Sequence, residues 1–277
     1  MLIPRYWAKT KGDATDPQGK KYALSIWGWS QEGVSDAVSV AQSRFREVVA
    51  RLTRGEPGDE YFYGRQPLRE ELIRTLGEPG ERTEALVTRN RYGALVLNTA
   101  RLPFADIDSP PAGLGSGLFG FFKKDKTDPT LLRIREAGAR HARSTLRIYR
   151  TFAGYRVLAA DLALDPKSES AQDFLAGFGS DPAFMKLCRI QGSFRARLTP
   201  KPWRLDLALP PNQYPRDEPA AQAEFDAWLK GYEQACSGFA TCKFLESMGS
   251  TRPSSETLAL VEEHDRMTRA QSDLPLA

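Results

Sequence analysis

The stretch LRIYRTFAGYRVLAA, residues 146–160, decides the fold class. Two runs rich in β-branched and aromatic residues, Leu146–Thr151 and Tyr155–Ala160, flank a Phe-Ala-Gly connection. Short apolar runs joined in this way predict a β-hairpin. Gly154 suits the connection because glycine allows the chain to turn tightly.

Similar patterns occur on both sides of this hairpin. Further strands are expected at residues 3–7, 22–29, 84–88, 94–98, 102–108 and 193–199. Helical spacing of apolar residues or helix-forming composition predicts helices at residues 34–52, 68–76, 129–143, 171–178, 182–190 and 219–237. Hairpins dominate and regular strand–helix alternation is missing, which predicts an α+β fold with a mainly antiparallel sheet and flanking helices. We expect a single large domain over residues 1–277, with a long flexible loop at residues 109–128.

Composition narrows the class of protein only slightly. The 277 residues are 41% hydrophobic, enough for a core, and the formal net charge is +4. This charge permits an anionic partner without demanding one. No apolar run is long enough for a membrane span and no export signal is visible, so we expect a cytoplasmic protein with no membrane partner. No protein partner can be identified from the sequence.

The first candidate site is Phe104-Ala-Asp-Ile-Asp108, at the end of a predicted strand. Strand alternation places Asp106 and Asp108 on one face. Paired carboxylates suit Mg²⁺ or Mn²⁺, which in phosphoryl-transfer sites neutralise phosphate charge. A third acidic ligand is normally needed, and the sequence offers Asp161, Glu262, Glu263 and Asp265 without selecting one. Alternatively, Asp108 begins an Asp-Ser-Pro-Pro turn and Asp106 pairs with an arginine.

Two basic segments are candidates for binding phosphate. They are Arg147–Arg156 in the hairpin and Ser193–Arg204, where a tryptophan interrupts the charges. Arginine binds phosphate oxygens in a bidentate manner, and positive charge beside an aromatic ring suits nucleotides or single-stranded nucleic acid. The predicted phosphate-binding residues are Arg147, Arg150, Arg156, Arg195, Arg197 and Lys201. Solvated basic strand faces that pair with surface acids would give the same pattern.

Other motifs carry less information. Gly115, Gly117 and Gly120 spell G-x-G-x-x-G, but the strand and helix of a dinucleotide site are missing around them. His264, within Glu-Glu-His-Asp, suggests a metal ligand or a general base, although a single additional histidine, His141, gives no triad.

Four segments carry a resemblance to known families: residues 89–99, 104–108, 149–156 and 194–204. They resemble a family of uncharacterised bacterial proteins with no established activity. More distantly, residues 94–204 are similar to the archaeo-eukaryotic primase and polymerase fold, whose first motif is a metal-binding acid pair. The position of that superfamily's histidine after the glycine turn holds Arg156, an exchange compatible with triphosphate binding but unfavourable for polymerase activity.

The sequence therefore predicts metal-dependent nucleotide or nucleic-acid phosphoryl transfer of a primase-like kind, with Asp106 and Asp108 as catalytic metal ligands. The alternative is a non-catalytic scaffold whose arginine-rich face engages an acidic partner. A dehalogenase-type phosphatase is less compatible, because its Asp-x-Asp lies near the N-terminus and is followed by threonine. Convergence of the candidate residues on one cleft would favour the enzyme, and their dispersal would favour the scaffold.

Overall fold

The computed structural model divides the chain into two compact units, which are described separately. The hairpin unit comprises residues 2–71, and the main unit comprises Met1 and residues 72–277. The structure describes residues 1–56, 67–77, 80, 84–110 and 128–277. The loop expected at residues 109–128 lies almost entirely outside the described residues. The expectation of a single domain stays a prediction.

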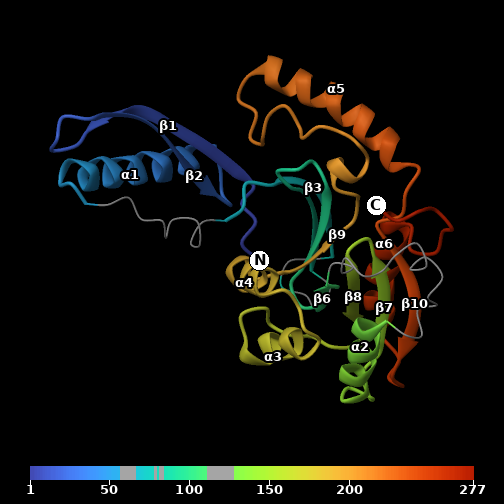
Figure 1. Ribbon diagram of the computed structural model, residues 1–277. Coiled ribbons are helices and arrows are strands. Elements are labelled where there is room, and N and C mark those ends of the chain that lie inside the picture. Colours follow the sequence, from blue (N-terminus) through green and yellow to red (C-terminus); the bar gives the residue numbers. More distant parts are fainter. Residues whose placement is uncertain (57–66, 78–79, 81–83, 111–127) are drawn as a thin grey trace. The chain divides into compact units, whose positions relative to one another are not determined.

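The hairpin unit consists of one long β-hairpin and one helix (Figure 1). Strands β1 (Tyr6–Thr15) and β2 (Lys21–Ser30) pair antiparallel along their whole length. Asp16 closes the turn, since its Oδ1 accepts hydrogen bonds from the backbone N–H of Gln18 and Lys20 at 3.0 and 2.9 Å. The predicted opening hairpin is confirmed, with longer strands and a shorter loop than expected.

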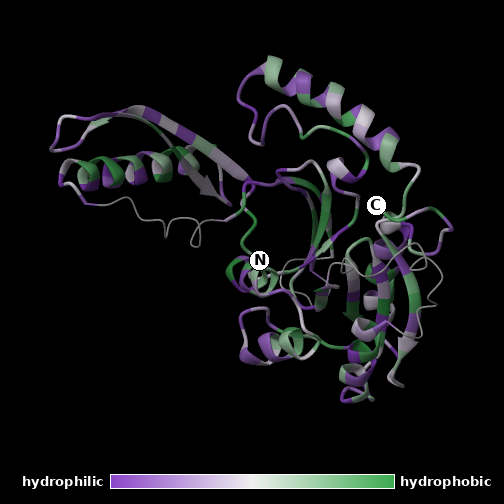
Figure 2. Cartoon of the chain, viewed as in Figure 1, coloured by the Kyte–Doolittle hydropathy of each residue, from purple (hydrophilic) through white to green (hydrophobic). Residues whose placement is uncertain are grey.

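Helix α1 (Val34–Thr53) confirms the helix that apolar spacing predicts at residues 34–52, and it lies against one face of this hairpin. Hydrophilic and hydrophobic residues alternate along it (Figure 2). Gly28 of β2 makes the close approach possible: a Cβ atom added there would lie 2.2 Å from the backbone nitrogen of Ala41 and 2.3 Å from the carbonyl oxygen of Ala37. Neither backbone atom can move away without shifting the helix.

Replacing Gly28 by alanine should therefore destabilise the hairpin unit by about 3 kcal/mol, because the added methyl group meets helix backbone. We expect a lower unfolding temperature and faster hydrogen exchange in α1. The control is Gly231→Ala on an exposed helical position where an added Cβ meets nothing within 4 Å. It should stabilise slightly, by about 0.5–1 kcal/mol. Unchanged exchange in α1 of the Gly28 variant would contradict the proposed packing.

The main unit contains two four-stranded sheets (Figure 1). The first has the order β3-β4-β5-β9 and is formed by Glu71–Leu76, Ala85–Arg89, Leu95–Thr99 and Phe194–Arg197. The second has the order β10-β7-β8-β6 and is formed by Cys242–Met248, Leu146–Thr151, Gly154–Ala159 and Phe104–Asp108. All described registers are antiparallel, and β6 contacts β9. The predicted α+β class with antiparallel sheets and flanking helices is confirmed.

Five α-helices and a short 3₁₀ helix accompany these sheets in the described part of the main unit. They are α2 (Pro129–Ala139), α3 (Glu169–Gly177), α4 (Pro182–Gln191), α5 (Pro219–Cys236), α6 (Ser255–Thr268) and the 3₁₀ helix Pro202–Arg204. The caps of α2, α3, α4 and α6 are the side chains of Asp128, Ser168, Asp181 and Ser254, each of which accepts a hydrogen bond from the first turn. Within the described ranges, none of the helices combines the length and the apolar character needed to cross a membrane.

Helices α2 and α6 contribute side chains to opposite faces of the second sheet. Tyr155, on one face, donates a hydrogen bond to Asp128 at the start of α2, at 2.6 Å. Tyr149, on the other face, packs edge-to-face against His264 of α6, with ring centroids 5.0 Å apart. The sheet is therefore buried on both sides, and the α6 side carries the candidate site.

Two predictions about the elements need correction or addition. The helix expected at residues 68–76 is wrong, because Glu71–Leu76 forms strand β3 beside β4. Sheet pairing outweighs the helical preference of its leucine, arginine and glutamate residues. Strand β10 was not predicted. A register shift between Phe244 and Glu246 interrupts its alternation, so the sequence lacks the usual signal.

Candidate functional site

The predicted acid pair lies on strand β6, opposite strand β8. Asp106 faces Arg156 across the two strands, with the carboxylate Oδ1 3.8 Å from the guanidinium Nε. Asp108 faces Gly154, where a side chain would collide with the backbone of Ile107 at 2.0 Å. Gly154 is therefore required for the close approach of β6 and β8, rather than for a positive φ in the turn.

Arg156 is buried, with 2% of its surface exposed. Its Nη1 donates hydrogen bonds to the carbonyl oxygen of Arg197 at 3.0 Å and to Nε2 of His264 at 3.1 Å. Its Nε has no hydrogen-bond partner among the described residues. The guanidinium thereby links β8, β9 and α6, and its Nε lies 3.8 Å from the carboxylate of Asp106 on β6.

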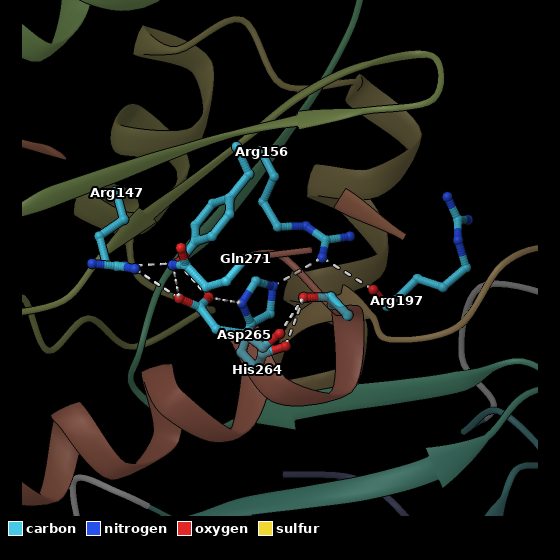
Figure 3. A network of polar contacts seen from close by, with 8 residues as sticks. Arg147, Arg156, Arg197, His264, Asp265 and Gln271 are labelled. Carbon is cyan, nitrogen blue, oxygen red and sulfur yellow. Dashed lines mark hydrogen bonds and ion pairs between the residues drawn. The ribbon is translucent and has the colours of Figure 1, made fainter. Parts of the chain in front are cut away.

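His264 belongs to a buried polar network that ends at Arg147 (Figure 3). Its Nδ1 lies 3.0 Å from Oδ1 of Asp265, which also accepts a hydrogen bond from the Tyr149 hydroxyl at 2.7 Å. Nη2 of Arg147 donates to Oδ2 of Asp265 at 2.7 Å. Both imidazole nitrogens are thus engaged within the protein, which leaves none for a metal ion or for general base catalysis.

Burial is the main cause that lowers the pKa of His264 from its usual value near 6.5 to about 4; the positive charge of Arg156 acts in the same direction, and Asp265 opposes it. The ring is therefore neutral at neutral pH. Its Nδ1–H donates to Asp265, so that Nε2 is free to accept from Arg156. Burial alone would raise the pKa of Asp265, but hydrogen bonds from His264 and Tyr149 lower it overall.

The pKa of His264 predicts a pH dependence of stability. The unfolded chain binds a proton at His264 near pH 6.5, whereas the folded protein does so only near pH 4. The stabilisation that comes from keeping His264 neutral should therefore be complete above about pH 6.5. The free energy of unfolding should fall by roughly 3 kcal/mol as the pH drops from there to about 4. Urea unfolding at several pH values measures this slope. A His264→Gln variant should lose most of it, and an unchanged slope would contradict the assignment.

Three further cations lie around the acid pair. Burial lowers the pKa of Arg197 to about 10, with Asp106 opposing the shift and Arg156 and Arg204 adding to it. Burial also lowers the pKa values of Lys201 and Arg204, while Asp106 and Asp108 raise them. Lys201 and Arg204 therefore lie within electrostatic range of both aspartates, and Arg197 lies within range of Asp106, Arg156 and Arg204. We call Asp106, Asp108, Arg156, Arg197, Lys201 and Arg204 the charged cluster.

Direct contacts also join the charged cluster. The Cζ atom of Arg204 lies 4.3 Å from the ring centroid of Phe152, in the turn between β7 and β8. The next residue of that turn, Ala153, accepts a hydrogen bond from the backbone N–H of Ser109 at 2.9 Å, beside Asp108. The 3₁₀ helix, the turn and the end of β6 therefore converge. With four cations and two carboxylates, the charged cluster has a net charge of +2.

The other predicted phosphate-binding residues are each engaged elsewhere. Arg147 pairs with Asp265 and lies at the opposite end of the network from Arg197 (Figure 3). Arg150 points to the other face of the sheet and pairs with Asp128 at 3.1 Å. Arg195 is buried and donates a hydrogen bond to Oδ1 of Asn98 at 2.6 Å. Of the six predicted residues, Arg156, Arg197 and Lys201 thus lie with the acid pair. Arg147, Arg150 and Arg195 do not.

Arg147 instead borders an open pocket of about 660 Å³ beside α6, together with Asp265, Arg266, Arg269 and Gln271. Its arginines already have protein partners: Arg147 pairs with Asp265, Arg266 pairs with Glu263, and Arg269 donates to the carbonyl of Ser237. The pocket therefore offers less free positive charge than the charged cluster.

The acid pair suits a divalent ion only in part. Among the described residues, no three His, Cys, Asp or Glu side chains lie close enough to hold a metal. Asp161, Glu262, Glu263 and Asp265 therefore supply no third ligand in the described part of the chain. Mg²⁺, however, is commonly held by one or two carboxylates together with phosphate oxygens of the substrate. Asp106 and Asp108 fit that arrangement.

Arg204 is the member of the charged cluster that was absent from the predicted site. It follows Trp203 in the basic segment, and that position alone gave no reason to prefer it over neighbouring arginines. A β-strand period does not extend through Pro200 and Pro202, so the direction of its side chain could not be predicted. The 3₁₀ helix and the contact with Phe152 provide the direction.

Comparisons with protein-family models, with curated proteins and with solved structures found no match for this chain.

Proposed function

We propose that the protein binds nucleotide or nucleic-acid phosphate at the charged cluster and carries out metal-dependent phosphoryl transfer there. The observation that carries the proposal is the convergence of four cations and two carboxylates from strands β6, β8 and β9 and the segment after β9. A net positive cluster that contains two carboxylates suits an anion that brings a metal ion with it.

The residues have distinct roles in this proposal. Arg197, Lys201 and Arg204 bind phosphate oxygens, because hydrogen bonds from charged donors to phosphate are stronger than those from neutral donors. Arg156 is too buried to reach far and holds Asp106 in place. Asp106 and Asp108 would hold Mg²⁺ or Mn²⁺, and the bound ion would neutralise negative charge on the phosphoryl group.

The scaffold alternative has less support. It requires an arginine-rich face open to an acidic partner. Arg147, Arg150 and Arg195 are instead paired with Asp265, Asp128 and Asn98 inside the main unit. Releasing them would leave these partners without their donors, at a cost in stability.

Phosphate binding is tested by calorimetric titration of tripolyphosphate. Lys201→Gln and Arg204→Gln should each weaken binding about tenfold, because each removes a charged donor worth about 1.5 kcal/mol or more. Lys230→Gln, at an exposed position of α5, is the matched control and should bind as the wild type does. If the control weakened binding equally, loss of net positive charge would explain the effect and no specific contact by Lys201 or Arg204 would be needed. Absence of binding to the wild type would refute the proposal.

Metal binding should depend on phosphate. The net charge of +2 repels a free divalent ion, whereas a metal–triphosphate complex is an anion. We therefore expect weak Mn²⁺ binding alone, and Mn²⁺ binding strengthened at least tenfold by nucleoside triphosphate. The Asp106→Asn, Asp108→Asn double variant should lose this coupling while retaining metal-free triphosphate binding. Tight binding of Mn²⁺ without phosphate, or unchanged coupling in the double variant, would disprove the assigned ligands.

A further inference from the structure

Two aromatic side chains are exposed beside the charged cluster. Trp203 is 47% exposed and Phe152 is 54% exposed. Among the described residues of the main unit, these are the only aromatic side chains that are largely exposed. Each lies under a cation of the charged cluster: Lys201 Nζ is 5.2 Å from the Trp203 ring centroid, and Arg204 Cζ is 4.3 Å from that of Phe152.

Local structure holds the indole of Trp203 in place. Pro202 begins the 3₁₀ helix, and the backbone N–H of Arg204 closes it through a hydrogen bond to the carbonyl of Lys201 at 2.9 Å. The Tyr92 ring stands perpendicular to the indole, at 86° and with centroids 5.2 Å apart. A fixed ring loses little conformational entropy when a ligand stacks on it.

The neighbours of Trp203 in sequence supply the phosphate contacts. Lys201 and Arg204 flank the indole within the same short segment, and both belong to the charged cluster. A ligand whose phosphate is bound by these two cations would therefore carry its next group toward the indole. Phe152 is the less suitable stacking surface, because the planar guanidinium of Arg204 lies 4.3 Å from its ring centroid, closer than the 5.2 Å that separate the Lys201 ammonium from the larger indole.

We propose that Trp203 stacks the base of the bound ligand, so that the charged cluster recognises a nucleobase joined to phosphate rather than phosphate alone. This inference rests on the proposed function and narrows its substrate class. A mononucleotide and a nucleotide of a single strand share this chemistry. An inorganic polyphosphate or a phosphorylated sugar lacks the base and would leave the indole unused.

The test compares ligands with and without a base. Tripolyphosphate, ATP and a single-stranded oligothymidylate are titrated calorimetrically, at a fixed Mn²⁺ concentration, into the wild type, Trp203→Ala and Trp203→Phe. Stacking on an aromatic ring should make ATP, the oligonucleotide or both bind about 5- to 150-fold more tightly than tripolyphosphate. Leu209→Ala, which truncates another exposed apolar side chain of the same region, is the control.

Trp203→Ala should abolish the advantage of the base while leaving the tripolyphosphate affinity unchanged, and Trp203→Phe should retain much of the advantage. An advantage confined to ATP identifies a mononucleotide, and one confined to the oligonucleotide identifies a strand. Equal affinities of all three ligands in the wild type, or an equal loss for all three in Trp203→Ala, would overturn base stacking with phosphate binding intact. Failure of every ligand to bind would instead overturn the proposed function, and the inference with it.

Discussion

The buried guanidinium of Arg156 is the interaction on which the arrangement of the main unit depends. A charge removed from water costs several kcal/mol unless hydrogen bonds and an opposite charge compensate it. Here the carbonyl oxygen of Arg197, Nε2 of His264 and the carboxylate of Asp106 provide that compensation. Because these partners come from β9, α6 and β6, one side chain of β8 fixes the relative positions of both sheets and of the last helix.

The neutral state of His264 is a condition for this arrangement. A protonated imidazole could not accept a hydrogen bond from Arg156 and would place a second positive charge beside it. Burial opposes protonation, and the hydrogen bond to Asp265 fixes the tautomer. The position of Asp106 thus depends on a helix about 150 residues farther along the chain, through a sequence of buried polar contacts.

Much of the fold follows from local sequence patterns. The hairpin around residues 152–153, strand β2 and helix α1 are visible because apolar runs or helical spacing continue over whole elements, whereas only the first two residues of β1 were recognised. Local patterns fail where pairing with a neighbouring strand determines the secondary structure. Glu71–Leu76 has a helical composition but pairs with β4, and the bulge in Cys242–Met248 hides the strand that completes the sheet beside β7.

By itself, the sequence determined which charged residues were candidates for binding metal or phosphate. It also determined that Asp106 and Asp108 share a strand face, because the two-residue period of a strand is a local property of the backbone. It could not separate Arg197 and Lys201 from Arg147, Arg150 and Arg195, since a surface ion pair and a phosphate site use the same residues. Only the tertiary structure decided which arginines already have ion-pair or hydrogen-bond partners within the protein. The physical reason is that compensation of a charge depends on distance in space, which the order of residues does not encode.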